Sequence, residues 1–328
     1  MKSSLATSLV LMLASVPGVH AAQGRAPAGM DANYPTRPIR VVVPQAPGGS
    51  NDIMARFIGG QLAERLGRQV VIDNRPGAEG MIGTEIVARA TPDGYTLLMA
   101  SAAFTMNPAV VRKLPYDPIK DFDWVAMLGN APVVITVGPS VPVNSLQDLI
   151  ALGKSKPNYI TIASAGGFMH FVSAMFRSHA GIDAVIALYK GGAPALIDVI
   201  SGQAHVAVPT FVTANTHIRS GKIKPLATGG AKRLPTLPHV PTAAEAGLPG
   251  YEAAIWWAWA TTAGTPAAVI NKLNTEVAAI LRLPETERRF AAESAEIDIR
   301  TPAEIRKMIP VNLAKWAKVA KDAGMPMH

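Results

Sequence analysis

Runs of β-branched residues alternate with helical segments along most of this chain, and glycine-containing turns join them. The first unit reads RPIRVVVP, then QAPGGSND, then a helix predicted over Asp52–Leu66. In that helix Met54, Ile58 and Leu62 recur at every fourth position and form one apolar face. Strands that alternate with helices in this way predict parallel-rich sheets with helices on their faces, an α/β fold.

The same order returns in the second half of the sequence. NYITIAS predicts a strand, AGG a turn and FMHFVSAMFRSHAG a helix, and the pattern continues through AVIALYKGG, APALIDVISGQ and HVAVPTF. Two α/β lobes of this kind would set their glycine turns, at the carboxyl ends of strands, facing each other across a cleft. We predict lobe one from residues 34–130, lobe two from 131–228, and a return crossing with the rest of lobe one from 229–328.

The segments around the two lobes are less regular. PAVVRKLPYDPIKDFDW is rich in proline and charge and predicts a connection. WWAWA has the alternation of a strand, and we expect its tryptophans to pack in the core rather than hold a ligand. Thr265 and Thr301 each precede a proline, which predicts two helices with a threonine N-cap and proline at the first position.

The first residues, MKSSLATSLVLMLASVPGVHAAQG, predict a secretory signal peptide. Lys2 gives a positive start, and Leu5–Val16 is apolar but too short to span a bilayer. VHA at positions 19–21 resembles a cleavage site that requires small residues. We therefore predict a signal peptide over 1–22, a flexible tail over 23–33, and a mature protein that is soluble and exported to the periplasm.

Composition narrows the classes of function. The chain has no cysteine, which excludes disulfides, cysteine–zinc sites and thiol nucleophiles. A net charge of +8 comes from scattered lysines and arginines, without the dense basic run and interleaved aromatics of a nucleic-acid surface. The sequence lacks a His-Glu-x-x-His pair, and DPIKDFD lacks the glycine and glutamate of a calcium loop. We expect no nucleic-acid partner, no metal and no cofactor.

The PGGSND loop has two physical interpretations. It could be only a tight strand–helix turn, or an anion site, because the backbone N–H groups at a helix start carry partial positive charge. It is neither a P-loop nor a Gly-x-Gly-x-x-Gly fingerprint, so Asp73 at the end of the second strand does not predict a nucleotide site. We expect Asp52 to brace the loop. An exported hydrolase or lyase that uses His170 is the enzymatic alternative, although no Gly-x-Ser-x-Gly elbow is present.

Seven stretches, in this order, resemble the periplasmic receptors of tripartite tricarboxylate transporters, also called Bug receptors. They are YPTRPIRVVVPQAPGGSNDIMAR, NRPGAEGMIGTEIVARATPDGYTLL, LPYDPIKDFDW, YKGGAPALIDVISGQ, IRSGKIKPLATGGAKR, LPHVPTAAEAGLPGYE and AGTPAAVINKLN. The resemblance implies a two-lobed type II periplasmic binding protein, a Venus flytrap without catalytic activity. It also implies a monomer that holds an organic acid, often a di- or tricarboxylate, and delivers it to the membrane permease subunits of such a transporter. Service to a sensor kinase of a two-component system is the alternative.

The resemblance also implies which residues bind the ligand. They are Gln45, Ala46, Gly48, Gly49, Ser50, Asn51, Asp52, Ser101 and Ala102 in lobe one, and Ser164, Ala165, Gly166, Gly167, His170, Tyr189 and Thr210 in lobe two. The chain departs from the family pattern at three places near this site: Gln45 replaces an apolar residue, SAGGFMH is a shortened turn, and Leu188 replaces a proline. These departures make the side of the site opposite the first carboxylate bulkier and more apolar, so we expect a monocarboxylate or an aromatic acid as the ligand.

Overall fold

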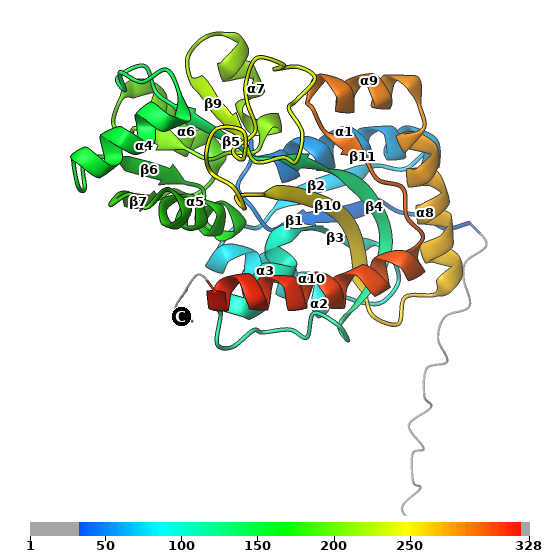
Figure 1. Cartoon of the computed structure of the whole chain (residues 1–328). Coiled ribbons are helices and arrows are strands. Elements are labelled where there is room, and N and C mark those ends of the chain that lie inside the picture. Colours follow the sequence, from blue (N-terminus) through cyan, green and yellow to red (C-terminus); the bar gives the residue numbers. More distant parts are fainter. Residues whose placement is uncertain (1–32, 323–328) are drawn as a thin grey trace, which may run out of the picture.

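The strand–turn–helix units form two separate β-sheets in the computed structural model, which describes residues 33–322 (Figure 1). The predicted signal peptide lies outside the described residues. Sheet one has the order β11-β4-β10-β3-β1-β2 and sheet two the order β7-β6-β8-β5-β9. Helices flank both sheets, and none of the helices within 33–322 is long and apolar enough to cross a membrane.

Sheet one combines parallel and antiparallel pairs. Strand β1 pairs in parallel with β2 and β3, because helices α1 and α2 carry the chain back to the starting edge. Strands β10, β4 and β11 are joined in antiparallel pairs, and β10 also pairs antiparallel with β3. The bounds are β1 Ile39–Val43, α1 Ser50–Leu66, β2 Val70–Asn74, α2 Met81–Ala88, β3 Thr96–Ser101, β4 Phe122–Pro132, β10 Ala254–Thr262 and β11 Glu296–Ile297.

Sheet two repeats this plan on a smaller scale. Strand β6 pairs in parallel with β7 and β8, whereas β5 pairs antiparallel with β8 and β9. The bounds are β5 Val134–Val137, α4 Leu146–Ser155, β6 Thr161–Ser164, α5 Gly167–Ala180, β7 Val185–Leu188, α6 Gly192–Ser201, β8 Val206–Ala207, α7 Phe211–Arg219 and β9 Lys224–Thr228. The predicted strand–turn–helix units therefore supply the parallel pairs of each sheet.

Two adjacent chain segments connect the sheets. The chain leaves sheet one between β4 and β5 and returns between β9 and β10. The segments are bonded to each other, since Val133 donates to the Ala253 carbonyl at 3.1 Å and Gly229 donates to the Val133 carbonyl at 2.8 Å. They run in opposite directions, which explains why β4 pairs antiparallel with β10, and β5 with β9.

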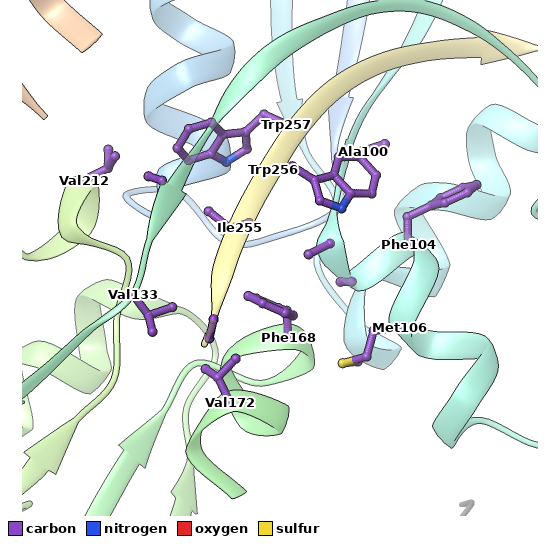
Figure 2. Packing of buried hydrophobic residues seen from close by; sticks show 14 of the residues in the cluster. Ala100, Phe104, Met106, Val133, Phe168, Val172, Val212, Ile255, Trp256 and Trp257 are labelled. Atoms are coloured by element: carbon purple, nitrogen blue, oxygen red, sulfur yellow. The ribbon is translucent and has the colours of Figure 1, made fainter. Parts of the chain in front are cut away.

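Apolar packing continues from one sheet to the other beside these crossings. Figure 2 shows Phe168 and Val172 of α5 in the same buried cluster as Met106 of α3 (Ala102–Val110) and Ile255 of β10. The C-terminal helix α10 (Pro302–Asp322) packs along α3. Its Trp316 meets the ring of Phe168 edge-on at 5.5 Å. Because Phe168 comes from the sheet-two side, this contact joins the two halves through buried aromatic surface.

The C-terminal helices confirm one N-cap prediction and correct another. At the start of α10, Thr301 accepts from the Glu304 N–H at 3.3 Å, and Glu304 accepts from the Thr301 N–H at 2.8 Å, a reciprocal capping box. Helix α8 (Ala267–Leu281) is capped by Pro266 instead of Thr265. The Thr265 hydroxyl donates to the Thr262 carbonyl at 2.8 Å, so it belongs to the end of β10.

Two further elements differ from the expected layout. The predicted connection that begins PAVVRK is helical in its first three residues, because α3 extends to Val110, which is buried together with Phe104 and Met106. A short helix, α9 (Pro284–Ala292), follows α8. The predicted WWAWA strand is confirmed as the centre of β10, with Trp257 and Trp259 fully buried.

Candidate ligand site between the two sheets

A cavity of about 560 Å³ lies between the sheets. Its wall on one side comes from the β1–α1 loop, the turn around Gly80 that precedes α2, and the start of α3. The turns that follow β6, β7 and β8 form the other wall. All of these segments follow the carboxyl ends of strands, where ligands bind in open α/β sheets.

Six helices of the described chain begin at the cavity wall. The residues there are Gly49 and Ser50 of α1, Gly80 of α2, Ser101 of α3, Gly166 and Gly167 of α5, Gly191 and Gly192 of α6, and Thr210 of α7. Of these six, α7 has a side-chain cap, since Thr210 accepts from the Thr213 N–H at 3.3 Å; α1, α2, α3, α5 and α6 have none. Uncapped helix starts leave backbone N–H donors unpaired and carry partial positive charge. This arrangement favours an anion.

The β1–α1 loop is held in place by Asp52, as expected from the sequence. Its Oδ2 accepts from the Gly48 N–H at 3.0 Å, and its Oδ1 lies 2.9 Å from Nη2 of Arg56. Burial alone would raise the pKa of the Asp52 carboxyl, but hydrogen bonds from Arg56, Gly48 and Asn74 outweigh it and hold the pKa below its usual value. Asp52 is therefore charged at neutral pH and engaged by the loop and its own helix.

A buried tryptophan fixes which groups of this loop are donors. The indole Nε1 of Trp257 donates to Oδ1 of Asn51 at 2.9 Å. Because an indole N–H can only donate, Asn51 must use its Nδ2 as a donor, and it gives that hydrogen bond to Oε1 of Gln45. The carbonyl of the Gln45 side chain is thereby occupied. Gln45, which lines the cavity, keeps its amide N–H groups for a ligand.

The two walls approach each other closely through small residues. A Cβ atom placed on Gly191 would lie 2.9 Å from Cβ of Ala46, and one placed on Gly48 would lie 3.4 Å from Cβ of Ala193. Gly191 has a φ of 132°, which residues with a side chain rarely adopt. Side chains at these positions would hold the walls apart, so the narrow gap depends on glycine and alanine.

The rest of the cavity wall is largely apolar. Phe168, Met169, Leu196, Val208 and Ile255 contribute to it. Phe168 is 3% exposed, and the contact with Trp316 described above fixes its ring. Burial of an apolar ligand portion here would add favourable hydrophobic free energy.

Two residues with acidic or basic side chains line the cavity among those that the structure describes, and the sequence prediction missed both. Glu79 lies in the short turn Ala78–Gly80, with φ 54° and ψ 27°, and Lys190 follows β7 with its side chain exposed. A sequence signal did exist: RPGAEG is another glycine-rich turn between a strand and a helix, so its loop belongs at the same sheet edge.

The structure brings most of the sequence-predicted site residues to the cavity wall. Those that line it are Gln45, Ala46, Gly49, Ser50, Asn51, Ser101, Ala165, Gly166, Gly167, Tyr189 and Thr210. The remaining predicted residues, Gly48, Asp52, Ala102, Ser164 and His170, are not among the lining residues. Gly48 and Asp52 support the loop, and Ala102 is a fully buried first residue of α3.

Side-chain partners add detail to two of the lobe-two residues. The Tyr189 hydroxyl donates to Oδ2 of Asp198 at 2.7 Å, and this hydrogen bond raises the pKa of Tyr189. The Ser164 hydroxyl is buried and has no hydrogen-bond partner within the described part of the chain.

Residues 33–322 contain no group of three or more histidines or carboxylates placed to hold a metal ion.

Comparison with known proteins gives a consistent result. The family model described as tripartite tricarboxylate transporter family receptor matches residues 54–325. BugT of Bordetella pertussis is 35% identical over 303 residues, which cover 91% of this chain and 93% of BugT. A solved Rhodopseudomonas palustris protein with adipate is 35% identical, with a TM-score of 0.87, and covers 90% of this chain and 100% of its own.

A second R. palustris structure, MatC with bound malate, is similar at a lower level. It is 30% identical, with a TM-score of 0.83, and the match covers 87% of this chain and 99% of MatC. Both structures span the two sheets described here, so the chain has the two-lobed periplasmic-binding-protein fold.

Proposed function

We propose a function from the premise that the chain belongs to the tripartite tricarboxylate transporter receptor family, whose members are periplasmic solute receptors without enzymatic activity. The proposed function is to capture an organic carboxylate between the two lobes and to deliver this acid to a membrane permease. One observation carries the proposal. Uncapped starts of α1, α2, α3, α5 and α6 converge on one cavity. A carboxylate can accept several of their N–H groups at once, with charge-assisted hydrogen bonds.

The relatives support an organic acid as the ligand. Adipate and malate, found in the two R. palustris structures, are small carboxylates. The apolar wall around Phe168 and Ile255 adds room for a hydrocarbon portion. We therefore propose a monocarboxylate or an aromatic acid, with its carboxylate at the β1–α1 loop and its apolar part against this wall.

The proposed ligand-binding residues combine cavity-lining residues with their immediate neighbours. We assign direct contacts to Gln45, Ser50, Asn51, Ser101 and Thr210, and backbone contacts to Gly49 and to the glycine turn at 166–167. Ala46, Ala165 and Tyr189 complete the lining part of the proposed site. Ala102, Ser164 and His170 adjoin it without lining the cavity, and Gly48 and Asp52 contribute by holding the loop. Each of these roles is a proposal that mutation can test residue by residue.

We assign residues 34–130 and 229–328 to lobe one and 131–228 to lobe two. The two adjacent crossings support these boundaries, since the chain changes sheets near Val133 and again after Thr228. A bonded pair of crossings can act as the hinge about which the lobes close. Closure removes water from the carboxylate and strengthens its hydrogen bonds.

Ligand binding is tested with freshly purified protein. Native mass spectrometry identifies any acid that copurifies, and calorimetry with a panel of mono-, di-, tri- and aromatic carboxylates measures affinity. We expect at least one carboxylate to bind with a Kd in the micromolar range or below. If no carboxylate of the panel binds, and the copurified ligand is not an acid, the proposed function is wrong.

Export and delivery need separate experiments. Mass analysis of the periplasmic fraction should show a chain that begins near Gln23, after removal of the predicted signal peptide, and gel filtration should show a monomer. Deletion of the gene should abolish uptake of the bound acid if the receptor serves a permease. Unchanged uptake, with loss of a transcriptional response to the acid, would instead support the sensor alternative.

A further inference from the structure

We propose that a chain of hydrogen bonds with one fixed direction, from Trp257 through Asn51 to Gln45, makes the β1–α1 end of the cavity reject ligand groups that carry an N–H. Ionised carboxylates are admitted there, and the amides of the same acids are rejected. The proposal rests on the proposed function, because it assumes that an organic acid binds with its carboxylate at this loop. It adds the residue that selects the carboxylate, Gln45, and a buried positioning residue that acts through it, Trp257.

The direction of the chain is set at its buried end. Trp257 lies in the centre of β10 and is fully buried, and its Nε1 donates to Oδ1 of Asn51 at 2.9 Å. An indole N–H can donate but cannot accept. Asn51 is 4% exposed, so a reversed amide would place two buried donors against each other without water to separate them. Leaving buried donors unpaired is unfavourable, which excludes the reversed amide.

The same direction passes on to the Gln45 side chain. Because Oδ1 of Asn51 accepts from the indole, Asn51 faces Gln45 with its Nδ2, and Oε1 of Gln45 accepts. The main-chain carbonyl of Gln45 accepts from Nδ2 of Asn74 at 3.0 Å, which holds the residue just after β1. Within residues 33–322 the Gln45 side chain bonds through its oxygen, so Nε2 keeps both hydrogens for a ligand.

The neighbours of Gln45 place its Nε2 at the cavity wall. A Cβ atom built on Gly80 would lie 3.3 Å from this Nε2, and the oxygen of the same amide contacts Asn51. Gly80, Gln45 and Asn51 all line the cavity, and Gln45 is partly exposed. The planar amide therefore lies along the wall, between the start of α1 and the turn before α2.

The other groups of the loop do not reverse this preference. The uncapped start of α1 offers backbone N–H donors. Asp52 could accept, but its oxygens are engaged by the Gly48 N–H at 3.0 Å and by Arg56 at 2.9 Å. The Ser50 hydroxyl can donate or accept, so it sets no direction. A ligand oxygen at Gln45 meets a donor, whereas an amide nitrogen there sets N–H against N–H, and such mismatched polar groups reject an analogue strongly.

Two pairs of probes test the selectivity: hexanoate with hexanamide, and benzoate with benzamide. Within each pair, one carboxylate oxygen is replaced by NH2. Calorimetry measures their affinities for the wild type, Gln45→Met and Gln45→Glu, and weak amides are measured by displacement of the acid. Gln45→Met keeps the length of the side chain and removes the donor, whereas Gln45→Glu puts an acceptor in its place.

The two variants should change the acids and the amides differently. Gln45→Met should weaken acid binding about tenfold and leave amide affinity no lower than in the wild type. Gln45→Glu should weaken acid binding more than about a hundredfold and raise amide affinity at least about threefold, because its acceptor meets the amide N–H and its charge repels the acid. Equal losses for acid and amide in Gln45→Met, or weaker amide binding in Gln45→Glu, would overturn the role of Gln45.

A double-mutant cycle tests whether Trp257 acts through Gln45. Trp257→Phe alone should weaken binding of the acid about tenfold, and less than about threefold when Gln45→Met is already present, because the group that it orients is gone. Trp259→Phe is the control, since Trp259 is equally buried and its Nε1 has no hydrogen-bond partner within the described residues. It should change acid affinity less than about threefold in either background. An effect of Trp257→Phe that persists in Gln45→Met would overturn the action of Trp257 through Gln45.

These outcomes are distinct from a failure of the proposed function. The Gln45 variants alter a partly exposed side chain, so they decide the selectivity even where Trp257→Phe lowers stability. Each contrary result above leaves the acid bound by the wild type and the proposed function intact. A wild type that binds neither hexanoate nor benzoate would overturn the selectivity proposed here. Only the failure of the whole carboxylate panel would overturn the proposed function as well.

Discussion

Replacement of Gly49 by aspartate should separate binding from stability. Gly49 is the N-cap of α1, with φ −81° and ψ 167°, a conformation open to any residue. A Cβ there would meet its nearest atom, the Ala46 carbonyl oxygen, at 3.8 Å, so the side chain fits. Aspartate is a good N-cap, whereas the present glycine provides no side-chain acceptor.

The two expected effects have opposite signs. The introduced carboxylate would complement the helix dipole and cap a free N–H, which stabilises the folded protein. Repulsion from Asp52 would offset part of this stabilisation. The net effect is roughly 0.5 kcal/mol of added stability in the ligand-free protein. For the ligand, a carboxylate about 4 Å from the new charge would lose roughly 4 kcal/mol at an effective dielectric constant near 20. That loss corresponds to about a thousandfold weaker binding.

The assay measures both quantities on three proteins. Urea unfolding gives the stability of the ligand-free wild type, Gly49→Asp and Gly49→Asn, and calorimetry gives their affinities for the tightest-binding acid of the panel. Gly49→Asn is the matched control, because it has the same shape and capping ability without the charge. We expect it to lose no more than about tenfold in affinity. Binding by Gly49→Asp within tenfold of wild type, or an equal loss in Gly49→Asn, would refute the reasoning.

Three further predictions concern the supports of the site. Asp52→Asn should lower the free energy of unfolding by about 1–2 kcal/mol at pH 7, measured by urea unfolding from pH 2 to 7. The pKa of Asp52 is lower in the folded protein than in the unfolded chain. The stability difference between wild type and variant is therefore present above the unfolded pKa near 4 and should vanish as the pH falls through the lower folded pKa. Trp257→Phe removes the donor to Asn51 and should weaken ligand binding by about tenfold in calorimetry. Trp259→Phe is its control, because the equally buried Trp259 Nε1 has no hydrogen-bond partner in the described chain, and a comparable loss there would contradict the role of the hydrogen bond. Glu79→Gly should raise the free energy of unfolding by about 0.5–1 kcal/mol through relief of the left-handed strain, and a lower stability in urea would show that the turn is not strained.

Much of the fold could be predicted because its signals are local. Apolar residues at every fourth position, as in Met54, Ile58 and Leu62, become the buried face of α1. Glycine turns after β-branched runs become the strand–helix turns of both sheets. The prediction was wrong at Thr265, because whether a threonine caps a helix or bonds the end of the preceding strand depends on the path of the chain before it.

The candidate site was only partly predictable. Gln45 and Ser50, which the resemblance assigned to the loop after the first strand, line the cavity. Glu79 and Lys190 were missed, since a glutamate in a surface-like turn and a lysine after an edge strand are ordinary in isolation. The donor state of Gln45 depends on Trp257, which is more than two hundred positions further along the chain.

The sequence by itself determined the two α/β lobes and the family, and it predicted an anion site at the first loop, because periodicity, turn glycines and short motifs extend over only a few residues. Only the tertiary structure decided that the starts of α1, α2, α3, α5, α6 and α7 share one cavity, and that Trp257 orients Asn51. It alone placed Glu79 in the cavity wall. These features depend on distances between segments that are remote in the chain, and such distances are set by the packing of both sheets around the crossings.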